Sequence, residues 1–579
     1  MPKYQAIRPS QFITTFGPGS IVETPSGPVV LKSVDELFRK NNIEPHDFEI
    51  MDDRMSQGVL EGAKICRIPT NAEIGEPEHE EIYPTDGLPY WALCTQHKSR
   101  DVLYQIGNGC PDCGTLPTWA RREKGGKEAI RFVMACEGGH LDEVPWSAVV
   151  HLHSKPCGAK HFHWHGGGRA LRLVRITCPT CGASENFGTA YGRSWKCSDR
   201  QPELGSRPES STCSRDAFIV QRGSANLRIA DLVTALTILD IPARLNDILG
   251  YGPLLHSIRT LRRLDRLTQE ELLTEAKESN IPADEIDYLA RTPWPEIEAA
   301  VDQLLAEQPV GELAFRAAEL RRLRQAATSG APVLDHEDER RGTPLFEVRR
   351  SQVRSVRGPN NRVTFRVTPV SRLRMVMVQR GFRRLDPNAP VVPTAFTRRT
   401  ATWYPGVELF GEGIFLDLGD THLTLEGSRL HSWEALHAQA DDPDDLTKHP
   451  VHVWWHSLAH RLLWALSVDS GYSSAAIRER VYLNVDSGQA TGGGVLLYTV
   501  QPGGDGTMGG MISLVDRFDR VLRRALGDVD TCSNDPLCEE AIGSGAEGAA
   551  CFSCLLASET SCEHRNHGLD RLLLAENLP

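Results

Sequence analysis

Apolar residues recur every three or four positions in two parts of the chain, and this spacing predicts helices there. Between residues 226 and 330 the pattern runs through ADLVTALTILDIPARLNDIL and WPEIEAAVDQLLAEQ. Beyond His449 it returns in WWHSLAHRLLWAL and MISLVDRFDRVLRRAL, and between these segments lie a glycine-rich loop and the run GGVLLYTV, which is typical of a strand. Helices alternating with a strand predict an α/β arrangement for this C-terminal part.

Alternation of apolar and basic residues predicts strands in a third part of the chain. RVTFRV and RLRMVMV place apolar side chains on one face and arginines on the other, and this region closes near residue 425 with GEGIFLDL. Short apolar runs with glycine and proline turns, as in FGPGSIVETPSGPVV, predict small β elements at the start of the chain.

These patterns predict an α+β multidomain protein. A chain of 579 residues exceeds what one hydrophobic core usually supports, because domains average roughly 150 residues. We predict five parts: an N-terminal β-containing segment, a cysteine-rich zinc-binding module of zinc-ribbon type, a helical region, an arginine-rich β region and a C-terminal α/β zinc-binding domain. Their predicted bounds are 1–90, 91–215, 216–335, 336–440 and 441–579.

Composition and charge narrow the function. With 40% hydrophobic and 24% charged residues, the chain has the make-up of a folded protein. Its net charge of -12 argues against positive potential over the whole surface, so any contact with nucleic acid has to be local. The opening MPKYQAIRPSQF lacks the apolar core of a signal peptide, and no apolar stretch is long enough to span a bilayer. We therefore expect a cytoplasmic protein without a membrane partner, in which thiols stay reduced.

Cysteine spacing predicts zinc. Twelve of the fifteen cysteines fall into three clusters, each with a C-x-x-C pair, and such a pair presents two thiolates to one ion. We expect two to three structural zinc ions and prefer this interpretation to a disulfide framework. Cys66, Cys136 and Cys157 remain outside the clusters and are interpreted as buried small side chains. The clusters are Cys94, His97, Cys110 and Cys113; Cys178, Cys181, Cys197 and Cys213; and Cys532, Cys538, Cys551, Cys554 and Cys562.

Arginine is concentrated in residues 340–399, which hold fifteen arginines, no lysine and only two acids, Glu347 and Asp386. Arginine makes bidentate contacts with phosphates and carboxylates. Two interpretations stay open: a track for nucleic acid, or a docking face for an acidic partner or for acidic parts of this protein, such as Asp441, Asp442, Asp444 and Asp445. The candidate contact residues are Arg349, Arg350, Arg354, Arg372, Arg374, Arg383 and Arg384.

No residue is assigned a catalytic role. His456 and His460 are four apart on a predicted helix, as two metal ligands would be, but HSLAH lacks the glutamate of H-E-x-x-H, so packing or hydrogen bonding is preferred. The loop GGDGTMGG at residues 503–510 could cradle a phosphate, yet the chain has no G-x4-G-K-[ST] segment, and we expect no ATP hydrolysis by this chain alone.

A histidine-rich stretch is the remaining catalytic candidate. Alternation along a strand would place three of its histidines on one face, where they could collect a metal. No base or nucleophile is spaced convincingly around them, so a structural or partly exposed set is preferred. The stretch contains His151, His153, His161, His163 and His165.

An ordered set of strings covers nearly the whole chain: RPSQFITTFGPGSIVE, RFVMACEGGHLDEVPW, QRGSAN, RLRMVMVQRGFRRL, GEGIF, HSLAHRLLWALSVDSGYSSAAIRERVY and the closing CSNDPLC and CFSCLLASETSCEHRNHGLDR. This set resembles the DrmB family, a core component of the bacterial DISARM anti-phage system. From about His449 onward the chain is also similar to a zinc-binding domain found at the C-terminal end of some superfamily-two DNA helicases. That similarity rests on Cys551-x-x-Cys554-Leu-Leu, Asn566 and Leu569-Asp570-Arg571.

The resemblance implies a non-catalytic subunit that binds a DrmA-type helicase in a core complex and helps it engage phage DNA, with no small-molecule substrate. The alternative is a stand-alone, zinc-dependent nucleic-acid-binding sensor of single strands or DNA ends. The chain departs from the family pattern at His97, where a cysteine is expected, and in the surplus thiol of the last cluster. For that cluster the preferred ligands are Cys538, Cys551, Cys554 and Cys562, with Cys532 left out.

Overall fold

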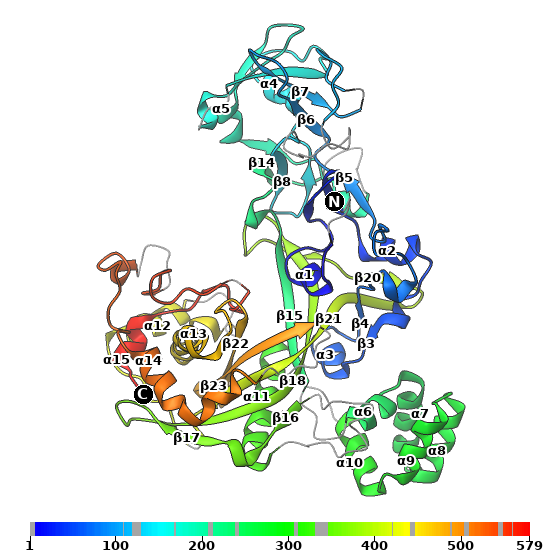
Figure 1. Cartoon of the computed structure of the whole chain (residues 1–579), viewed down its shortest axis with the longest axis vertical. Coiled ribbons are helices and arrows are strands. Elements are labelled where there is room, and N and C mark those ends of the chain that lie inside the picture. The colour runs from blue at the N-terminus through cyan, green and yellow to red at the C-terminus, as the bar shows by residue number, and fades with distance from the viewer. Residues whose placement is uncertain are drawn as a thin grey trace. The chain divides into compact units, whose positions relative to one another are not determined.

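The structure is a computed structural model in which two compact units of mixed helix and strand content form, so the predicted α+β multidomain class is confirmed (Figure 1). It describes residues 6–107, 109–117, 129–166, 170–205, 212–237, 243–305, 311–330, 346–419, 421–439, 446–486, 489–502, 509–541, 548–558 and 560–579. Unit 1 consists of Met1–Ile50, Ala63–Val233 and Met377–Val407. Unit 2 consists of Met51–Gly62, Thr234–Val376 and Glu408–Pro579.

Unit 1 contains three small antiparallel sheets. Their strand orders are β1-β2-β5, β12-β11-β10-β7-β6 and β13-β14-β8-β9. Aromatic side chains form the core beside the second sheet, where Trp164 packs against Trp146 and Phe187. The elements are α1 (Pro9–Thr14), β1 (Ile21–Thr24), β2 (Gly27–Leu31), α2 (Val34–Lys40), β3 (Glu49–Ile50), β4 (Lys64–Arg67), β5 (Thr85–Gly87), β6 (Trp91–Cys94), β7 (Asp101–Gln105), β8 (Phe132–Cys136), β9 (Leu141–Asp142), α4 (Trp146–Val150), β10 (His161–His165), β11 (Arg175–Thr177), β12 (Ser184–Asn186), α5 (Phe187–Tyr191), β13 (Ser194–Lys196), β14 (Asp216–Gln221), β19 (Val392–Pro393) and β20 (Phe396–Arg398).

The boundary between the units falls within three long strands, β15 (Ile229–Thr237), β18 (Thr364–Arg383) and β21 (Ala401–Asp417). In unit 1, β18 pairs with β19, and β21 pairs with β4 and β20. In unit 2, β18 pairs with β16 and β17, and β21 pairs with β23. The strands predicted from RVTFRV and RLRMVMV are therefore present in β18, but this strand is buried along most of both faces. A strand covered on both sides leaves no open basic face.

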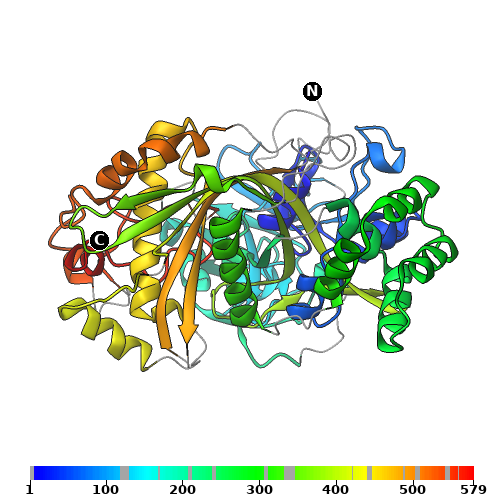
Figure 2. The same cartoon turned by 90° about the horizontal axis from the view of Figure 1, so that it is seen from below.

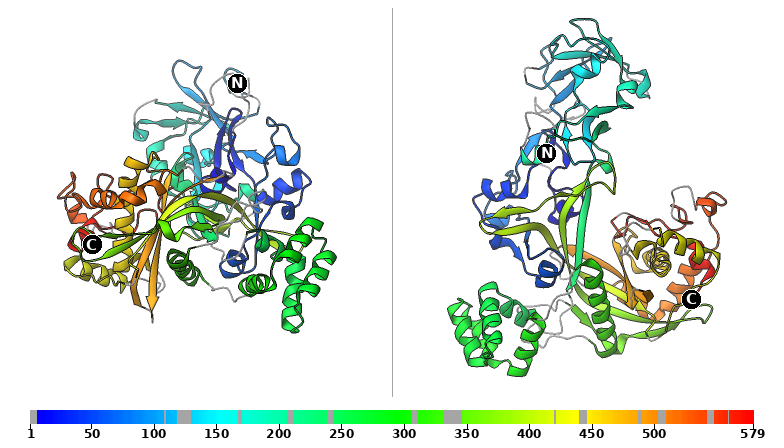
Figure 3. Two further views of the ribbon diagram at one scale, coloured as in Figure 1. Left: turned by 60° about the horizontal axis from the view of Figure 1, so that its bottom comes forward. Right: turned by 180° about the vertical axis from the view of Figure 1, so that it is seen from behind.

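One predicted helix is a strand. The segment ADLVTALT lies in β15, where buried and less buried positions alternate at first. The β-branched residues Ile229, Val233 and Thr234 of β15 favour an extended backbone. An apolar run this short is compatible with the spacing of a helix and with that of a strand. The helices predicted after it are present. They pack on one another around an apolar core of their own (green in Figures 1 and 3) and are α6 (Ala243–Leu249), α7 (Gly252–Arg263), α8 (Gln269–Glu278), α9 (Ala283–Arg291) and α10 (Trp294–Leu305).

The main core of unit 2 surrounds helix α13 (Pro450–Ser470), which is buried on almost every side. The helix lies along the antiparallel strands β22 (Ile477–Asp486) and β23 (Gln489–Pro502) (Figure 2), and α14 (Phe518–Leu526) packs against it. A helix that is apolar all round belongs in a core. The other elements of unit 2 are α3 (Asp53–Gly58), α11 (Glu312–Ser329), β16 (Phe346–Val348), β17 (Arg354–Arg357), α12 (Ser428–His437) and α15 (Arg571–Glu576).

Across the described residues, no helix combines the length and the apolar character needed to cross a membrane.

Candidate metal centres and the arginine-rich region

The first predicted cluster comes together as expected. Cys94 ends β6, and the loop after β7 brings Cys110 and Cys113 beside it. The Nε2 atom of His97 lies 3.3 Å from Cys110 Sγ, and the Sγ atoms of Cys94 and Cys113 are 3.7 Å apart. These separations suit four ligands of one tetrahedral zinc ion.

The thiol chemistry of this group also fits a cation. The hydroxyl and backbone N–H of Thr115 lower the pKa of Cys113 to about 6, whereas burial raises the pKa of Cys94 to about 12. Several thiolates can be held this close only when a positive ion neutralises them.

The second predicted cluster is wrong as a single group, because its four cysteines divide between two sheets. Cys178 follows β11 and Cys181 lies in the adjoining turn, where they meet His151 and Cys157. The Nε2 atom of His151 is 3.3 Å from Cys181 Sγ, and the Sγ atoms of Cys157 and Cys178 are 3.4 Å apart. Burial would raise the pKa of Cys178, but the backbone N–H groups of Cys181 and Thr180 outweigh it and lower that pKa to about 6.

Cys197 and Cys213 belong to another group, completed by Cys136 and His140. The Nδ1 atom of His140 lies 3.3 Å from Cys136 Sγ and 3.4 Å from Cys197 Sγ. Between Cys136 and His140 the chain turns through Gly139, whose φ of +91° favours glycine. Cys136 and Cys157 are therefore more than the small buried side chains predicted. Cys66 is buried as predicted and lies outside these two groups. The spacing C-x3-H in ACEGGH was the signal that could have placed Cys136 and His140 together.

The C-terminal group also differs from the preferred set. Cys532, Cys538, Cys551 and Cys554 come together, whereas Cys562 lies elsewhere. The Sγ atom of Cys551 is 3.4 Å from that of Cys532 and 3.7 Å from that of Cys554. Leu537 and Phe552, which flank Cys538 and Cys551 in the chain, are 78% and 89% exposed. The sequence could not choose among five thiols, because the choice depends on where the segment after Cys554 packs.

Cys562 joins His456, His460 and Glu479 in a buried group of unit 2. Because Cys562 is part of this group, the C-terminal cluster has its four cysteines without a surplus thiol. In the described residues, the groups that could hold a metal thus exceed the two to three ions expected.

The histidines of β10 share one face, as their alternation predicts. The Nε2 atom of His163 lies 3.4 Å from the carboxylate of Asp112, and that of His161 lies 3.7 Å from it. His165 is 2.9 Å from the hydroxyl of Thr177. These three histidines are partly exposed, and His151 belongs to the neighbouring group that could hold a metal.

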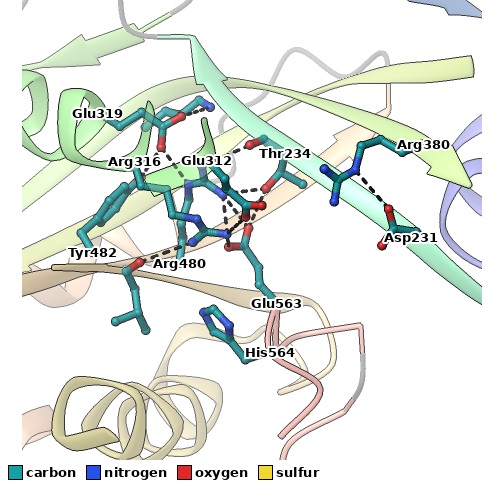
Figure 4. Close-up of polar contacts among 12 residues, drawn as sticks. Asp231, Thr234, Glu312, Arg316, Glu319, Arg380, Arg480, Tyr482, Glu563 and His564 are labelled. Atoms are coloured by element: carbon teal, nitrogen blue, oxygen red, sulfur yellow. Dashed lines mark hydrogen bonds and ion pairs between the residues drawn. The ribbon is translucent and has the colours of Figure 1, made fainter. Parts of the chain in front are cut away.

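Three of the candidate contact arginines, Arg372, Arg374 and Arg384, are buried, and Arg383 is partly buried. Arg384 is fully buried and donates to the carbonyl oxygens of Gly19, Gly139 and Leu227. Arg383 donates to Asp231 at 2.6 Å, beside the contact between Arg380 and Asp231 drawn in Figure 4.

In unit 2, Arg374 donates from Nε to Glu408 at 2.8 Å. Arg372 is buried with its guanidinium over the ring of Phe410. Arg374 and Arg383 thus each pair with an acid of this protein, Glu408 and Asp231 respectively. The stretch from Asp441 to Asp445 lies outside the described residues, and so does most of the loop at residues 503–510.

The other three candidate arginines keep exposed surface. Arg349 pairs with Glu347 at 2.7 Å, and Arg354 pairs with Asp516 at 2.8 Å. Arg350 is exposed next to them. A nucleic-acid or partner contact in this region therefore has Arg349, Arg350 and Arg354 to use.

A buried ion network joins distant parts of unit 2 (Figure 4). Arg480 on β22 donates to Glu319 on α11 at 2.8 Å and to Glu563 of the C-terminal segment at 3.0 Å. Arg316 also pairs with Glu563 at 3.0 Å, and the hydroxyl of Tyr482 donates to Glu319. Sequence reasoning missed this network, because no local spacing marks it.

The chain matches two domain families and is similar to one known protein along most of its length. Residues 8–229 match a domain family of unknown function, DUF8724, and residues 458–555 match the MrfA Zn-binding domain family. The latter range contains Cys532, Cys538, Cys551 and Cys554, the four cysteines that come together in the structure. Over 561 residues the chain is 27% identical to a protein described as DISARM protein DrmB from Bacillus paralicheniformis (strain ATCC 9945a / NCIMB 11709 / CD-2), covering 87% of this chain and 91% of that protein. The resemblance predicted from the sequence is confirmed.

Proposed function

Because the chain is similar to a DISARM DrmB protein along most of its length, we propose that it is a non-catalytic, zinc-binding subunit of a DISARM-like anti-phage complex. In this role it forms a heterodimer with a DrmA-type helicase in the cytoplasm and helps that helicase engage phage DNA. The observation that carries the proposal is the extent of the match, which concerns nearly the whole chain and not one zinc module.

The metal groups support a structural role for zinc. Each of the cysteine-containing groups in unit 1, like the C-terminal one, offers four protein ligands. A zinc ion held by four protein ligands keeps no position for water or substrate, whereas a catalytic zinc keeps one open. In these groups zinc would hold loops between short strands, which supports an accessory subunit more than an enzyme.

The surface of the C-terminal zinc group supports a protein partner. Leu537 and Phe552 expose large apolar side chains beside ligands that fix their backbone. Exposed apolar residues on a rigid support are typical of interaction sites. We assign this surface, defined by Leu537 and Phe552, to contact with the helicase.

DNA contact belongs to the complex in this proposal. The exposed arginines Arg349, Arg350 and Arg354 give a small basic patch, which is too limited to hold DNA against the chain's net charge of -12 without another basic surface. The alternative, a stand-alone sensor of single strands or DNA ends, has less support because Arg372, Arg374 and Arg384 are buried and Arg383 is paired with Asp231.

The test is co-expression with the DrmA-type helicase of the same system, followed by gel filtration and an assay of DNA-stimulated ATP hydrolysis. We expect one stable complex whose ATPase activity differs from that of the helicase alone. Two separate peaks with unchanged ATPase activity would refute the subunit role. Tight, salt-sensitive DNA binding by the isolated chain would then favour the sensor.

A further inference from the structure

A second group of side chains of the types that bind metals lies in the core of unit 2, and it shares no residue with the four-cysteine group. His456 and His460 stand one turn apart on α13, Glu479 comes from β22, and Cys562 comes from the segment before α15. All four are buried, with Glu479 and His456 showing no exposed surface. Three separate parts of the chain thus deliver ligand-type side chains to one enclosed point.

The distances match a coordination shell. The Nε2 atom of His456 lies 3.2 Å from Cys562 Sγ and 3.4 Å from Glu479 Oε1. All four potential ligand atoms lie within 4.8 Å of one another. Ligands of a tetrahedral zinc ion with bonds of about 2.0–2.3 Å are separated by roughly 3.3–3.8 Å, so small side-chain shifts would complete the shell.

Backbone groups hold the ligands in the orientation that metal binding needs. The Nδ1 atom of His456 is 3.1 Å from the carbonyl oxygen of Gly568, and that of His460 is 2.8 Å from the carbonyl oxygen of Leu555. A carbonyl oxygen only accepts, so each Nδ1 carries the proton and each Nε2 presents a lone pair to the centre. The backbone N–H of Asn566 lies 3.2 Å from Cys562 Sγ, as is common for metal-bound thiolates.

Two buried polar atoms at this point have no hydrogen-bond partner among the described residues. They are Nε2 of His460 and Oε2 of Glu479. A buried polar atom without a partner costs about 1–3 kcal/mol, and more when the group is charged. A cation between the four side chains would satisfy both atoms at once, whereas the packing role preferred from the sequence leaves them unsatisfied.

The arginines near this group are paired with other carboxylates. Arg480 and Arg316 are already paired with Glu319, Glu312 and Glu563 (Figure 4). In the described part of the chain, Glu479 has no ion pair with an arginine or lysine, and the neutral ring of His456 that faces it carries no charge. A buried carboxylate needs a compensating positive charge, and a divalent ion supplies it for both the carboxylate and a thiolate.

We propose that His456, His460, Glu479 and Cys562 bind one divalent cation of the zinc type, and that this ion fastens the C-terminal segment to α13 and β22. Two imidazoles, one thiolate and one carboxylate suit zinc better than magnesium or calcium, which prefer oxygen ligands. With four protein ligands in a closed core, the ion is structural. His456 and Cys562 lie outside residues 458–555, the range matched to the zinc-binding family. The inference goes beyond the proposed function and does not depend on it.

The decisive measurement is X-ray diffraction from the full-length protein, purified with zinc, at the zinc absorption edge. We expect an anomalous peak enclosed by His456, His460, Glu479 and Cys562, in addition to one at the four-cysteine group. A peak at the four-cysteine group with none among these side chains would overturn the proposal. Because it uses the unaltered chain, this measurement decides even where a variant fails to fold.

Zinc content gives a second readout. The variants Cys562→Ser and His460→Gln should each contain one zinc fewer per chain than the wild type, and combining them should remove no further ion. Cys66→Ser is the matched control, since Cys66 is buried and hydrogen-bonds to a carbonyl oxygen, and it should leave the zinc content unchanged. Wild-type zinc content in folded Cys562→Ser and His460→Gln protein would contradict the site. Neither readout involves the helicase, so the site and the proposed function fail separately.

Discussion

Arg480 donates a hydrogen bond from Nε to Glu319 Oε2 at 2.8 Å, with both side chains almost completely buried. The pair joins β22 to α11 in the interior of unit 2. Charges this deep are stable only when each has its partner, so the network constrains more of the fold than a surface ion pair does.

Removing Glu319 should therefore destabilise unit 2 strongly. Glu319→Ala leaves the buried Arg480 guanidinium with Glu563 as its remaining carboxylate partner, and loss of one partner from a buried pair costs about 3–5 kcal/mol. Tryptophan fluorescence during urea unfolding reports this, because Trp433, Trp454 and Trp455 lie in the core of unit 2. The control is Asp519→Ala, which breaks the exposed pair with Arg523 and should cost no more than about 1 kcal/mol. Equal effects of the two changes would refute the importance of the buried network.

The cysteines of unit 1 form two groups where the spacing predicted one, and this difference predicts the zinc content of single variants. Cys136→Ser and Cys157→Ser should each lose one zinc per chain, and the double variant should lose two, because the two thiols serve different ions. Elemental analysis of purified protein measures this. If the four cysteines first grouped by spacing were the ligands of a single ion, neither substitution would change the zinc content.

Substituting a buried arginine should affect stability, whereas substituting exposed arginines should affect DNA binding. Arg384→Met loses three donated hydrogen bonds to buried carbonyl oxygens and should lower the thermal unfolding temperature of the chain. Replacing Arg349, Arg350 and Arg354 together with glutamate should leave that temperature nearly unchanged.

The same triple variant should weaken DNA binding by the helicase complex. Each lost phosphate contact on duplex DNA makes the negative slope of log affinity against log salt shallower by about 0.9. Fluorescence anisotropy of labelled DNA at several salt concentrations measures it. An unaltered salt slope would show that this patch does not contact DNA.

The apolar surface beside the C-terminal zinc group should govern assembly. Leu537→Ser with Phe552→Ser removes both exposed apolar side chains and should reduce recovery of the helicase by at least about tenfold, equivalent to about 1.4 kcal/mol. Co-purification from co-expressing cells measures this. Leu173→Ser, at another exposed leucine, is the control and should retain the complex. Full recovery with the double variant would place the interface elsewhere.

Spacing along the sequence predicted the metal ligands that come together within one hairpin and its loops. Cys94 ends β6, His97 lies in the turn to the paired strand β7, and Cys110 and Cys113 lie in the loop after β7, so their sequence positions were sufficient to group them. Cys178 and Cys197 looked like neighbours along the chain, but β11 and β13 belong to different sheets, and strand pairing is not encoded in cysteine spacing. The five-part division of the chain remains a prediction, since the two compact units draw on interleaved stretches.

The arginine-rich strands show a second limit of sequence reasoning. Alternation predicted the strands of β18 and a basic face, but whether that face meets solvent depends on what covers it. Arg374 meets Glu408, and Arg383 meets Asp231, both from other strands. The four-residue spacing of His456 and His460 predicted that these two side chains lie close together. Glu479 and Cys562 come from other parts of the chain, and no sequence motif links them to the two histidines.

Glu563 has a consequence for how the protein is made. Its carboxylate neutralises Arg316 and Arg480, yet it emerges from the ribosome long after both of them. Until translation reaches Glu563, Arg480 has only Glu319 and Arg316 has only Glu312 as a carboxylate partner. We therefore expect a product that stops before Glu563 to fold less stably in unit 2 and to be cleaved faster by proteases than the full chain.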